Sequence, residues 1–301
     1  MTTTAHTPVV CAVVVIYRPE TAVLRELLAA VGPQVAATVV VDNGSDRSDT
    51  GLAELLQQPA VTMLRNDSNH GLAKALNQGI AWARQQHATH VLLLDQDSTP
   101  APDMVARLLA ALARLEADGP VGAVGPTLID PRTGRRAHFV RFGFPLNPLV
   151  HAAPDEIVRC DFLTTSGSLI PMTVLDRFGG MEEPFFIDHI DVEWCARVRQ
   201  GGFRIHGVGS ATMLHRIGDR LLMGTRLFVH SPERLYYIMR NRVLLYRLPH
   251  IPWAWIGQDL LRIPIKFALF SLFVPGRLRN IGGMLAGLRD GVLGRNGPRA
   301  T

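Results

Sequence analysis

The chain has 301 residues, of which 47% are hydrophobic and 19% charged, and it carries a formal net charge of +5. This is the composition of a globular protein, and the length allows one large α/β core with a modest extension. The three cysteines, Cys11, Cys160 and Cys195, are far apart and form no CxxC pair, so neither a disulfide framework nor a structural zinc site is predicted. The N-terminal residues lack the basic region of a signal peptide, which favours a cytoplasmic location.

Positive charge is concentrated near the C-terminus, where thirteen arginines and one lysine occur from Arg216 onward. Such an extension suggests an anionic partner. Nucleic acid is disfavoured, because no zinc spacing, RNP-like motif or heptad repeat accompanies the basic residues. An anionic membrane surface is favoured over core packing or a homodimer contact, and the apolar stretch 263–274 is too short to cross a bilayer. Aromatic side chains alternate with the arginines: Trp253, Trp255, Phe267, Phe270 and Phe273.

Segments typical of strands and helices alternate over the first 130 residues. Short apolar runs bounded by turn residues predict strands, and apolar residues at helical spacing predict helices. This alternation predicts a three-layer α/β/α domain around a mostly parallel sheet. In chain order the expected strands are 9–16, 37–41, 61–64, 91–94 and 121–129, and the expected helices are 21–31, 48–57, 71–86 and 102–117.

The pattern changes after Asp130, where segments rich in proline and glycine follow. We expect a strand near 157–163, a turn at 165–168, a helix over 191–200 and a further helix that begins at Ser231. The predicted division is therefore a core domain over residues 1–218 and a basic, amphipathic helical extension over residues 219–301.

Two acidic clusters follow apolar segments. Asp95-Gln96-Asp97 directly follows the apolar run 91–94, and Asp188, Asp191 and Glu193 come much later. The carboxyl ends of strands line the ligand crevice of an open α/β sheet, and carboxylate oxygens are the ligands preferred by Mg²⁺ or Mn²⁺. This chemistry is suited to binding a diphosphate.

Each cluster also has a structural interpretation. Asp97 or Ser98 would cap the following helix, and Asp188 would be the N-cap of the helix that starts near Asp191, with further acids in its first turn. The sequence Asp42-Asn43-Gly44-Ser45 is equally typical of a turn. Because two carboxylates two residues apart repel each other unless a cation lies between them, the metal-binding interpretation is favoured for the first cluster.

Five motifs resemble, in order, those of the family 2 inverting glycosyltransferases, and the resemblance covers about residues 9–247. Within that family the Asp-Gln-Asp-Ser form and the His215-Arg216-Ile217-Gly218-Asp219 segment are most similar to bacterial rhamnosyltransferases. The motifs are Val13-Val14-Val15-Ile16-Tyr17, Val40-Val41-Asp42-Asn43-Gly44-Ser45, Asn69-His70-Gly71-Leu72-Ala73-Lys74, Leu94-Asp95-Gln96-Asp97-Ser98 and Phe185-Phe186-Ile187-Asp188-His189-Ile190-Asp191-Val192-Glu193-Trp194.

The resemblance implies a GT-A fold and assigns roles to individual residues. Tyr17 and Asp42 would hold the nucleoside, and Asp95-Gln96-Asp97 would be the DxD motif that reaches the ribose and a metal-bound diphosphate. Asp191 occupies the position of the catalytic base, and His215 lies where relatives carry a histidine near the metal. Further nucleotide-sugar contacts are expected at Asn43, Asn69, Lys74 and Arg240, and acceptor contacts at Thr165, Ser166, Gly167, Asp188, Glu193 and Trp194.

Other interpretations remain open for His215 and for the pair Arg240-Asn241. A histidine after an apolar strand is often a packed or surface residue, which applies to His215. The pair Arg240-Asn241 would face either the donor diphosphate or an acceptor phosphate, or would belong to a solvated basic face.

The implied activity is metal-dependent transfer of L-rhamnose from dTDP-L-rhamnose to a lipid-linked or growing polysaccharide acceptor, by an enzyme peripheral to the inner face of the cell membrane. Inverting transfer requires one carboxylate base and a cation for the leaving diphosphate, whereas a glycosidase requires paired acids on either side of the glycosidic bond. The alternatives are a UDP-hexose or galactofuranose donor, and a non-catalytic protein that binds nucleotide sugars.

Overall fold

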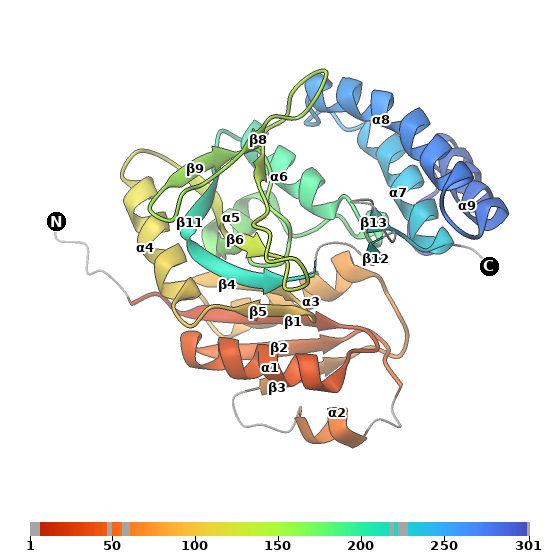
Figure 1. The fold of residues 1–301 in the computed structure, drawn as a ribbon. Coiled ribbons are helices and arrows are strands. Elements are labelled where there is room, and N and C mark those ends of the chain that lie inside the picture. The colour runs from red at the N-terminus through yellow and green to blue at the C-terminus, as the bar shows by residue number, and fades with distance from the viewer. Residues whose placement is uncertain (1–6, 47–49, 56–60, 217–219, 222–227, 300–301) are drawn as a thin grey trace.

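The structure, a computed structural model, describes residues 7–46, 50–55, 61–216, 220–221 and 228–299. Within these residues the centre of the molecule is a nine-stranded mixed sheet (Figure 1). Strands β1 to β4 are parallel to one another, as are β6 and β11, whereas β5, β9 and β10 run antiparallel to their neighbours. The spatial order is β3 (Val61–Arg65), β2 (Ala37–Asp42), β1 (Val10–Ile16), β4 (His90–Asp95), β10 (Leu169–Pro171), β6 (Val121–Ile129), β11 (Arg204–His215) and β5 (Ser98–Pro100), with β9 (Ile157–Cys160) also on β11.

Helices cover both faces of the sheet, which confirms the predicted three-layer α/β/α architecture. Successive residues of a strand point to opposite faces. Accordingly, Val13 and Val15 belong to one hydrophobic core, while Val14 and Ile16 belong to the other. The first core includes residues of α3 (Leu72–Gln85), α5 (Met172–Phe178) and α6 (Ile190–Gln200), and the second includes residues of α1 (Thr21–Val31), α2 (Thr50–Leu55) and α4 (Met104–Glu116).

The predicted strands and helices of the first 130 residues are present, with small shifts of their ends. The predicted helix 48–57 is described only from Thr50 to Leu55, and its remaining residues lie outside the described ones. Strands β5 and β10 and helix α5 were not predicted, because segments of three to seven residues are too short to show a period. A two-stranded ribbon of β7 (Phe139–Val140) and β8 (Leu149–Val150) was missed for the same reason.

Both capping interpretations of the acidic clusters are wrong. Helix α4 has Asp103 as its N-cap, and Ser98 lies in β5 instead. Helix α6 has His189 as its N-cap, without a side-chain cap. The carboxylates of both clusters are therefore available for other interactions.

In the C-terminal extension, a ribbon of β12 (Arg220–Leu221) and β13 (Phe228–Val229) precedes three helices. The helices α7 (Pro232–Leu245), α8 (Trp253–Leu272) and α9 (Arg277–Val292) pack together beside the sheet (Figure 1). Ser231 caps α7 through a hydrogen bond from the backbone N–H of Arg234, as expected for a helix that begins there. The predicted boundary between residues 218 and 219 lies outside the described residues. Among the described residues, no helix has both the length and the apolar character needed to cross a membrane.

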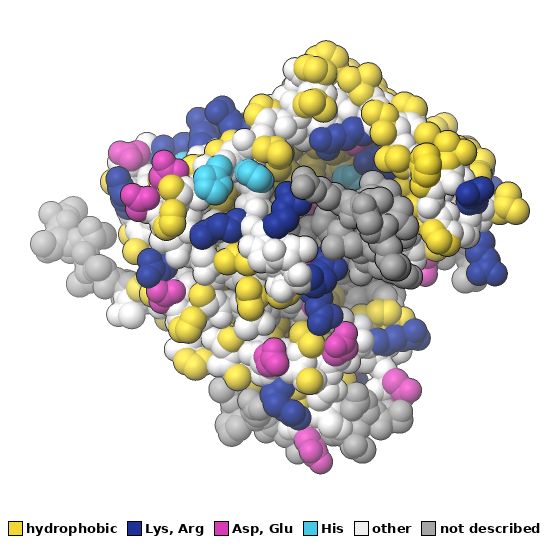
Figure 2. All heavy atoms as spheres, in the orientation of Figure 1, with side chains coloured by type: hydrophobic (Ala, Val, Ile, Leu, Met, Phe, Trp, Pro, Cys, Tyr) yellow, Lys and Arg dark blue, Asp and Glu magenta, His cyan; other side chains and the backbone are white. Residues whose placement is uncertain are grey.

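The aromatic residues of the extension divide between the interior and the surface. Trp255 and Phe270 are buried, which supports the core-packing alternative for these two side chains. Trp253 and Phe273 are 84% and 64% exposed. Figure 2 shows hydrophobic side chains gathered on the outer side of the region that contains α8 and α9. We call the exposed apolar side chains of α8 the apolar face of α8: Trp253, Leu260, Leu261, Ile265 and Leu272.

Candidate active site

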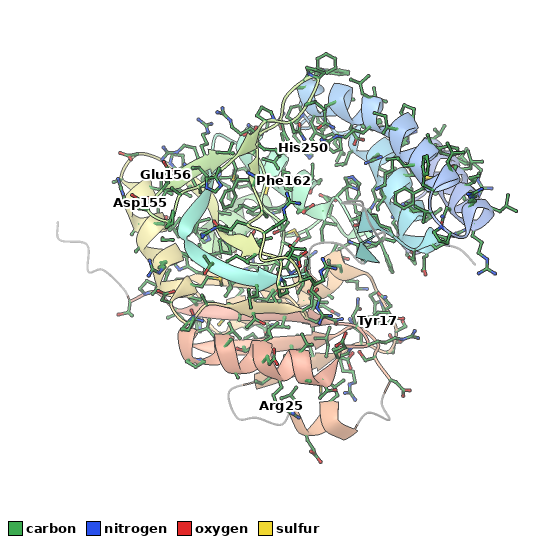
Figure 3. All side chains as sticks on the ribbon, viewed as in Figure 1. Tyr17, Arg25, Asp155, Glu156, Phe162 and His250 are labelled. Carbon is green, nitrogen blue, oxygen red and sulfur yellow. The ribbon has the colours of Figure 1, made fainter. Side chains whose placement is uncertain are left out.

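A cavity of about 1040 Å³ opens at the carboxyl ends of β1 and β4 and extends to α7 and α8. Its position is the one expected for a ligand site in an open α/β sheet. Tyr17, which directly follows β1 (Figure 3), lines the cavity, and so does Lys266 of α8. The C-terminal extension is therefore part of the wall of the site.

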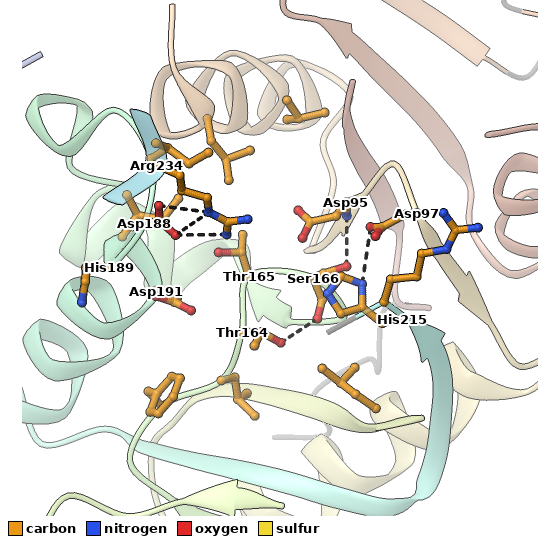
Figure 4. A pocket seen from close by; sticks show the side chains of 18 of the residues that line it. Asp95, Asp97, Thr164, Thr165, Ser166, Asp188, His189, Asp191, His215 and Arg234 are labelled. Carbon is orange, nitrogen blue, oxygen red and sulfur yellow. Dashed lines mark hydrogen bonds and ion pairs between the residues drawn. The ribbon is translucent and has the colours of Figure 1, made fainter. Parts of the chain in front are cut away.

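Asp95, Asp97 and His215 form a cluster in this cavity (Figure 4), and one candidate ligand atom of each lies within 4.8 Å of the others. The antiparallel pairing of β11 with β5 places His215 opposite Ser98, one residue after Asp97. His215 Nδ1 lies 3.6 Å from Asp97 Oδ1 and 3.1 Å from Ser98 Oγ. Burial, together with the neighbouring charge of Asp97, raises the pKa of Asp95. The structure thus brings the predicted metal ligands together. Their donor set of two carboxylates and one imidazole fits Mn²⁺ or Mg²⁺.

The predicted nucleoside-binding residues lie at the ends of β1 and β2. Tyr17 and Asn43 line the cavity, and Asn43 Nδ2 donates a hydrogen bond of 3.0 Å to Asn69 Oδ1, which also belongs to the lining. Asp42 is fully buried, and its carboxylate accepts from Ser45 N–H at 2.9 Å and pairs with the Arg65 guanidinium at 3.1 Å. Asp42 therefore shapes the turn beside the cavity rather than lining it. Lys74, on α3, is also outside the lining.

A turn before β10 supplies the predicted acceptor residues Thr165 and Ser166, both of which line the cavity. Ser166 Oγ accepts a hydrogen bond from the Asp95 backbone N–H at 3.0 Å and lies 2.6 Å from Ser98 Oγ. Gly167 is not in the lining; its φ of +90° and its contact with Pro126 make it a turn residue. The hydroxyl groups thus connect the turn to the metal cluster.

Asp191 lies in the first turn of α6, in the part of the cavity that also contains Asp188 (Figure 4). Its Oδ1 accepts a hydrogen bond of 2.8 Å from the Val192 N–H. The second carboxylate oxygen, Oδ2, takes no part in this hydrogen bond. Burial, assisted by the negative charge of Asp188, raises the pKa of Asp191 to about 6. A carboxyl group with such a pKa is ionised near neutral pH and is still a competent proton acceptor.

Arg234 was missed by the sequence analysis, although it lines the cavity from α7. Its guanidinium contacts the Asp188 carboxylate at 3.0 Å through Nη2 and at 3.2 Å through Nε (Figure 4). The sequence offers no signal that separates Arg234 from the other arginines of the extension, because only the packing of α7 directs it into the cavity.

The loop that carries Asp188 is conformationally strained. Phe186, Asp188 and His189 have φ angles of 65°, 64° and 64°, which are unfavourable for residues other than glycine. The side-chain amide of Asn241 stabilises this conformation, because it donates to the carbonyl oxygens of Phe185 at 3.0 Å, Ile187 at 2.6 Å and Asp188 at 3.0 Å. Helix α7 therefore sets the position of the loop.

Arg240 does not face the cavity, and both the phosphate-binding and the solvated-face interpretations of it are corrected. It is fully buried and donates hydrogen bonds to the carbonyl oxygens of Phe185 at 2.9 Å and Pro184 at 3.3 Å. Its guanidinium also lies over the ring of Tyr237, at 4.9 Å. These contacts make Arg240 a partner of Asn241 in holding the loop.

Glu193 and Trp194 are also absent from the cavity lining, contrary to their expected contact with an acceptor. Glu193 is fully buried and forms ion pairs with Arg197 and His250, each at 2.9 Å. The Trp194 indole N–H donates to the Gly179 carbonyl oxygen at 3.0 Å. The helical period accounts for Glu193, which lies about 200° around the helix axis from Asp191. Trp194 is instead taken up by the hydrophobic core, where it is 2% exposed.

Comparison with known proteins agrees with this geometry. The family model described as glycosyl transferase family 2 matches residues 12–173. The chain belongs to this family. A dTDP-rhamnosyl transferase, RfbF, of Shigella flexneri is 30% identical over 268 residues, which cover 87% of this chain and 85% of that protein. The galactofuranosyltransferase GlfT1 of Mycolicibacterium smegmatis is 27% identical over 92% of this chain and 97% of that protein.

Solved structures of low sequence identity share the fold of this family 2 glycosyltransferase. GalNAc-T7, crystallised with UDP, GalNAc and Mn²⁺, has a TM-score of 0.60 at 15% identity, and the match covers 89% of this chain and 58% of that one. Residues 1–349 of S. aureus TarS in complex with UDP-GlcNAc give a TM-score of 0.57 at 14% identity, over 95% of this chain and 92% of that one. The predicted GT-A fold is confirmed.

Proposed function

We propose that this family 2 glycosyltransferase moves L-rhamnose, with inversion, from dTDP-L-rhamnose to a lipid-linked or growing polysaccharide acceptor. The observation that carries the proposal is that one cavity joins the Asp95, Asp97 and His215 cluster to a separate, partly buried carboxylate, Asp191. Inverting transfer needs these two groups and no second acid. The identity to the Shigella flexneri dTDP-rhamnosyl transferase supports the choice of donor.

In this proposal the donor occupies the half of the cavity at the ends of β1, β2 and β4. Asp95, Asp97 and His215 hold a Mg²⁺ or Mn²⁺ ion, which, when bound, neutralises the charge that develops on the leaving diphosphate. Tyr17 and Asn43 bind the nucleoside, and Asn69 keeps Asn43 in place through the hydrogen bond between their amides. Asp42 contributes to nucleoside binding indirectly, because its carboxylate stabilises the turn that contains Asn43.

The acceptor occupies the half that contains Asp191 and Thr165. The Asp191 carboxylate removes the proton of the attacking acceptor hydroxyl through its Oδ2, while Oδ1 stays bound to the Val192 N–H. Arg234 engages the Asp188 carboxylate in a bidentate ion pair, so that Asp191 remains as the base.

A different donor is the second candidate, and a specific observation favours it. One relative transfers galactofuranose according to its name, and one structural neighbour is complexed with UDP-GlcNAc. A non-catalytic binding protein would not need a partly buried Asp191 beside the metal cluster. We also infer that the enzyme is peripheral to the inner face of the cell membrane, which the apolar face of α8 supports.

A donor panel tests the function. Release of nucleoside diphosphate is measured with dTDP-L-rhamnose, UDP-galactofuranose and UDP-GlcNAc, each with Mn²⁺ and with EDTA, in the presence of a membrane glycolipid extract. The proposal expects release from dTDP-L-rhamnose alone and its loss in EDTA. Release from a UDP-sugar instead would contradict the rhamnosyl donor, and undiminished release in EDTA would contradict the metal.

A further inference from the structure

The end of the cavity that is formed by the C-terminal helices is lined by three cationic side chains: Arg234 and Arg242 of α7 and Lys266 of α8. Arg234 is paired with Asp188 at 3.0 Å, and Arg242 with Asp259 at 3.3 Å. Lys266 Nζ lies over the Phe270 ring at 5.6 Å and has no ion pair or hydrogen bond within the part of the chain that the structure describes. Of these three cations, Lys266 is therefore the one that no carboxylate of the described residues pairs with.

Keeping the unpaired ammonium group of Lys266 away from water is energetically costly when no ligand is bound. Burial, together with the nearby Arg242 guanidinium, lowers the pKa of Lys266 to about 8. One buried nitrogen atom in the same lining, His189 Nδ1, also lacks a hydrogen-bond partner in the described residues. Native proteins satisfy nearly all buried polar groups, so an unpaired ammonium and an unsatisfied ring nitrogen in one cavity indicate a missing ligand.

This cluster is separate from the metal cluster. Asp95 interacts electrostatically with His215, Asp97 and Arg234. Lys266 interacts with Arg242, Asp188, Asp259 and Arg234. Arg234 is the one group common to both sets, and Figure 4 shows Arg234, Asp188 and His189 on the other side of the pocket from Asp97 and His215. This is the side of the cavity that the proposed function gives to the acceptor.

We propose that Lys266, Arg242 and the His189 ring form a second anion subsite, which binds a phosphate or diphosphate group of the acceptor. The inference rests on the proposed function only for the assignment of this half to the acceptor. The position of Lys266 on α8 favours a phosphate that is joined to a hydrocarbon chain. Lys266 lines the cavity, while its neighbour Ile265 is 60% exposed in the apolar face of the same helix. A phosphate on the glycan itself would fit the same cations.

Binding of farnesyl phosphate to the full chain, saturated with dTDP and Mn²⁺, tests the subsite by titration calorimetry. Farnesyl phosphate is expected to bind the wild type, and Lys266→Met to weaken it about tenfold or more, because a charge-assisted contact is lost. Lys266→Arg should retain most of the affinity. Arg262→Ala is the matched control, since Arg262 is an exposed cation on the same helix outside the cavity lining, and its loss should change nothing.

Equal affinity of Lys266→Met and the wild type, or no binding of farnesyl phosphate to the wild type, would overturn the subsite. Unchanged dTDP affinity shows that the variant is folded. If dTDP itself does not bind, the proposed donor half fails, and titration of the nucleotide-free protein still decides the subsite. Titrations with inorganic phosphate and farnesol distinguish the two possible sources of the phosphate group. Equal affinity for inorganic phosphate and farnesyl phosphate indicates a phosphate on the glycan. Tighter binding of farnesyl phosphate indicates a lipid phosphate.

Discussion

The Asp191 carboxyl group is partly buried in the first turn of α6, and desolvation is the main cause of its raised pKa of about 6. Removing its charge by Asp191→Asn should lower kcat by about 10²-fold or more, because general-base catalysis contributes roughly that factor. The affinity for dTDP should stay within about twofold, since the nucleoside residues lie on other strands. Steady-state kinetics and dTDP titration measure the two effects. Near-normal turnover would contradict the assignment, and Asp155→Asn, at an exposed acid, is the control.

The same substitution should change stability in the opposite direction. Because the folded state raises the pKa of Asp191 from 3.8 to about 6, it binds the proton more tightly than the unfolded state does. This contribution to stability is present at low pH and is lost as the pH rises through about 6. Asn does not ionise, so Asp191→Asn should be more stable than the wild type at pH 8, by up to about 3 kcal/mol at 1.36 kcal/mol per pKa unit. Chemical denaturation at pH 4 and pH 8 checks this, and a difference that does not grow with pH would contradict it.

Sequence patterns identified some site residues and could not identify others. Asp95, Asp97 and Asp191 were found because carboxylates after apolar segments are conspicuous, and His215 because of a motif. Lys266 and Arg234 were not found, since a single cation in a basic helix looks the same whether it faces a cavity or water. Arg240 was misinterpreted for that reason too: its burial against the loop is decided by the packing of α7, which no local pattern encodes.

At the scale of elements, α7 anchors the loop before α6 through Asn241. The three hydrogen bonds of the Asn241 amide compensate for the positive φ angles of Phe186, Asp188 and His189. Asn241→Leu should therefore lower the free energy of unfolding by about 2–4 kcal/mol, since buried carbonyl groups lose their donors. Denaturant titration measures this. Gln200→Leu removes an exposed amide with a single contact of 3.4 Å and should cost almost nothing.

Asn241→Leu should also lower kcat when assayed below its unfolding temperature, because the loop sets the position of Asp188 and the start of α6. The affinity for dTDP should change little. A stability loss with unchanged kcat would mean that the loop keeps its conformation without α7.

Element prediction succeeded for β1 to β4, β6 and β9, and failed for the three-residue strands β5 and β10. Val10–Ile16 and His90–Asp95 are continuous apolar runs, as strands buried on both faces should be. Ser98–Pro100 is a strand only because β11 lies beside it. That pairing places His215 near Asp97, so the part of the fold that was hardest to predict also completes the metal cluster.

At the scale of the whole molecule, the apolar face of α8 makes membrane association testable without truncation. Removing the helices would delete the core residues Trp255 and Phe270 and strip Lys266 from the cavity, so the surface is better changed in place. Leu261→Glu with Ile265→Glu should reduce co-sedimentation with anionic vesicles several-fold. Each basic residue near the surface contributes about 1 kcal/mol, which salt screens, whereas apolar contacts are insensitive to salt. Wild-type binding should thus weaken at high salt but persist.

Met63→Glu is the control for this experiment, because Met63 is an exposed apolar residue on β3, in a different part of the fold. Equal sedimentation of the α8 double variant and the wild type, or none for either, would favour a packing or dimer role for the exposed side chains.

The size of the cavity has a kinetic consequence. At about 1040 Å³ it lies at the upper end of ligand sites, and both the metal cluster and Asp191 line it. Donor and acceptor can therefore be bound simultaneously, and initial-rate plots at several acceptor concentrations should give intersecting rather than parallel lines. A single synthetic molecule that bridges both halves would lose its translational freedom once instead of twice. Such a bisubstrate compound should bind more tightly than either of its parts.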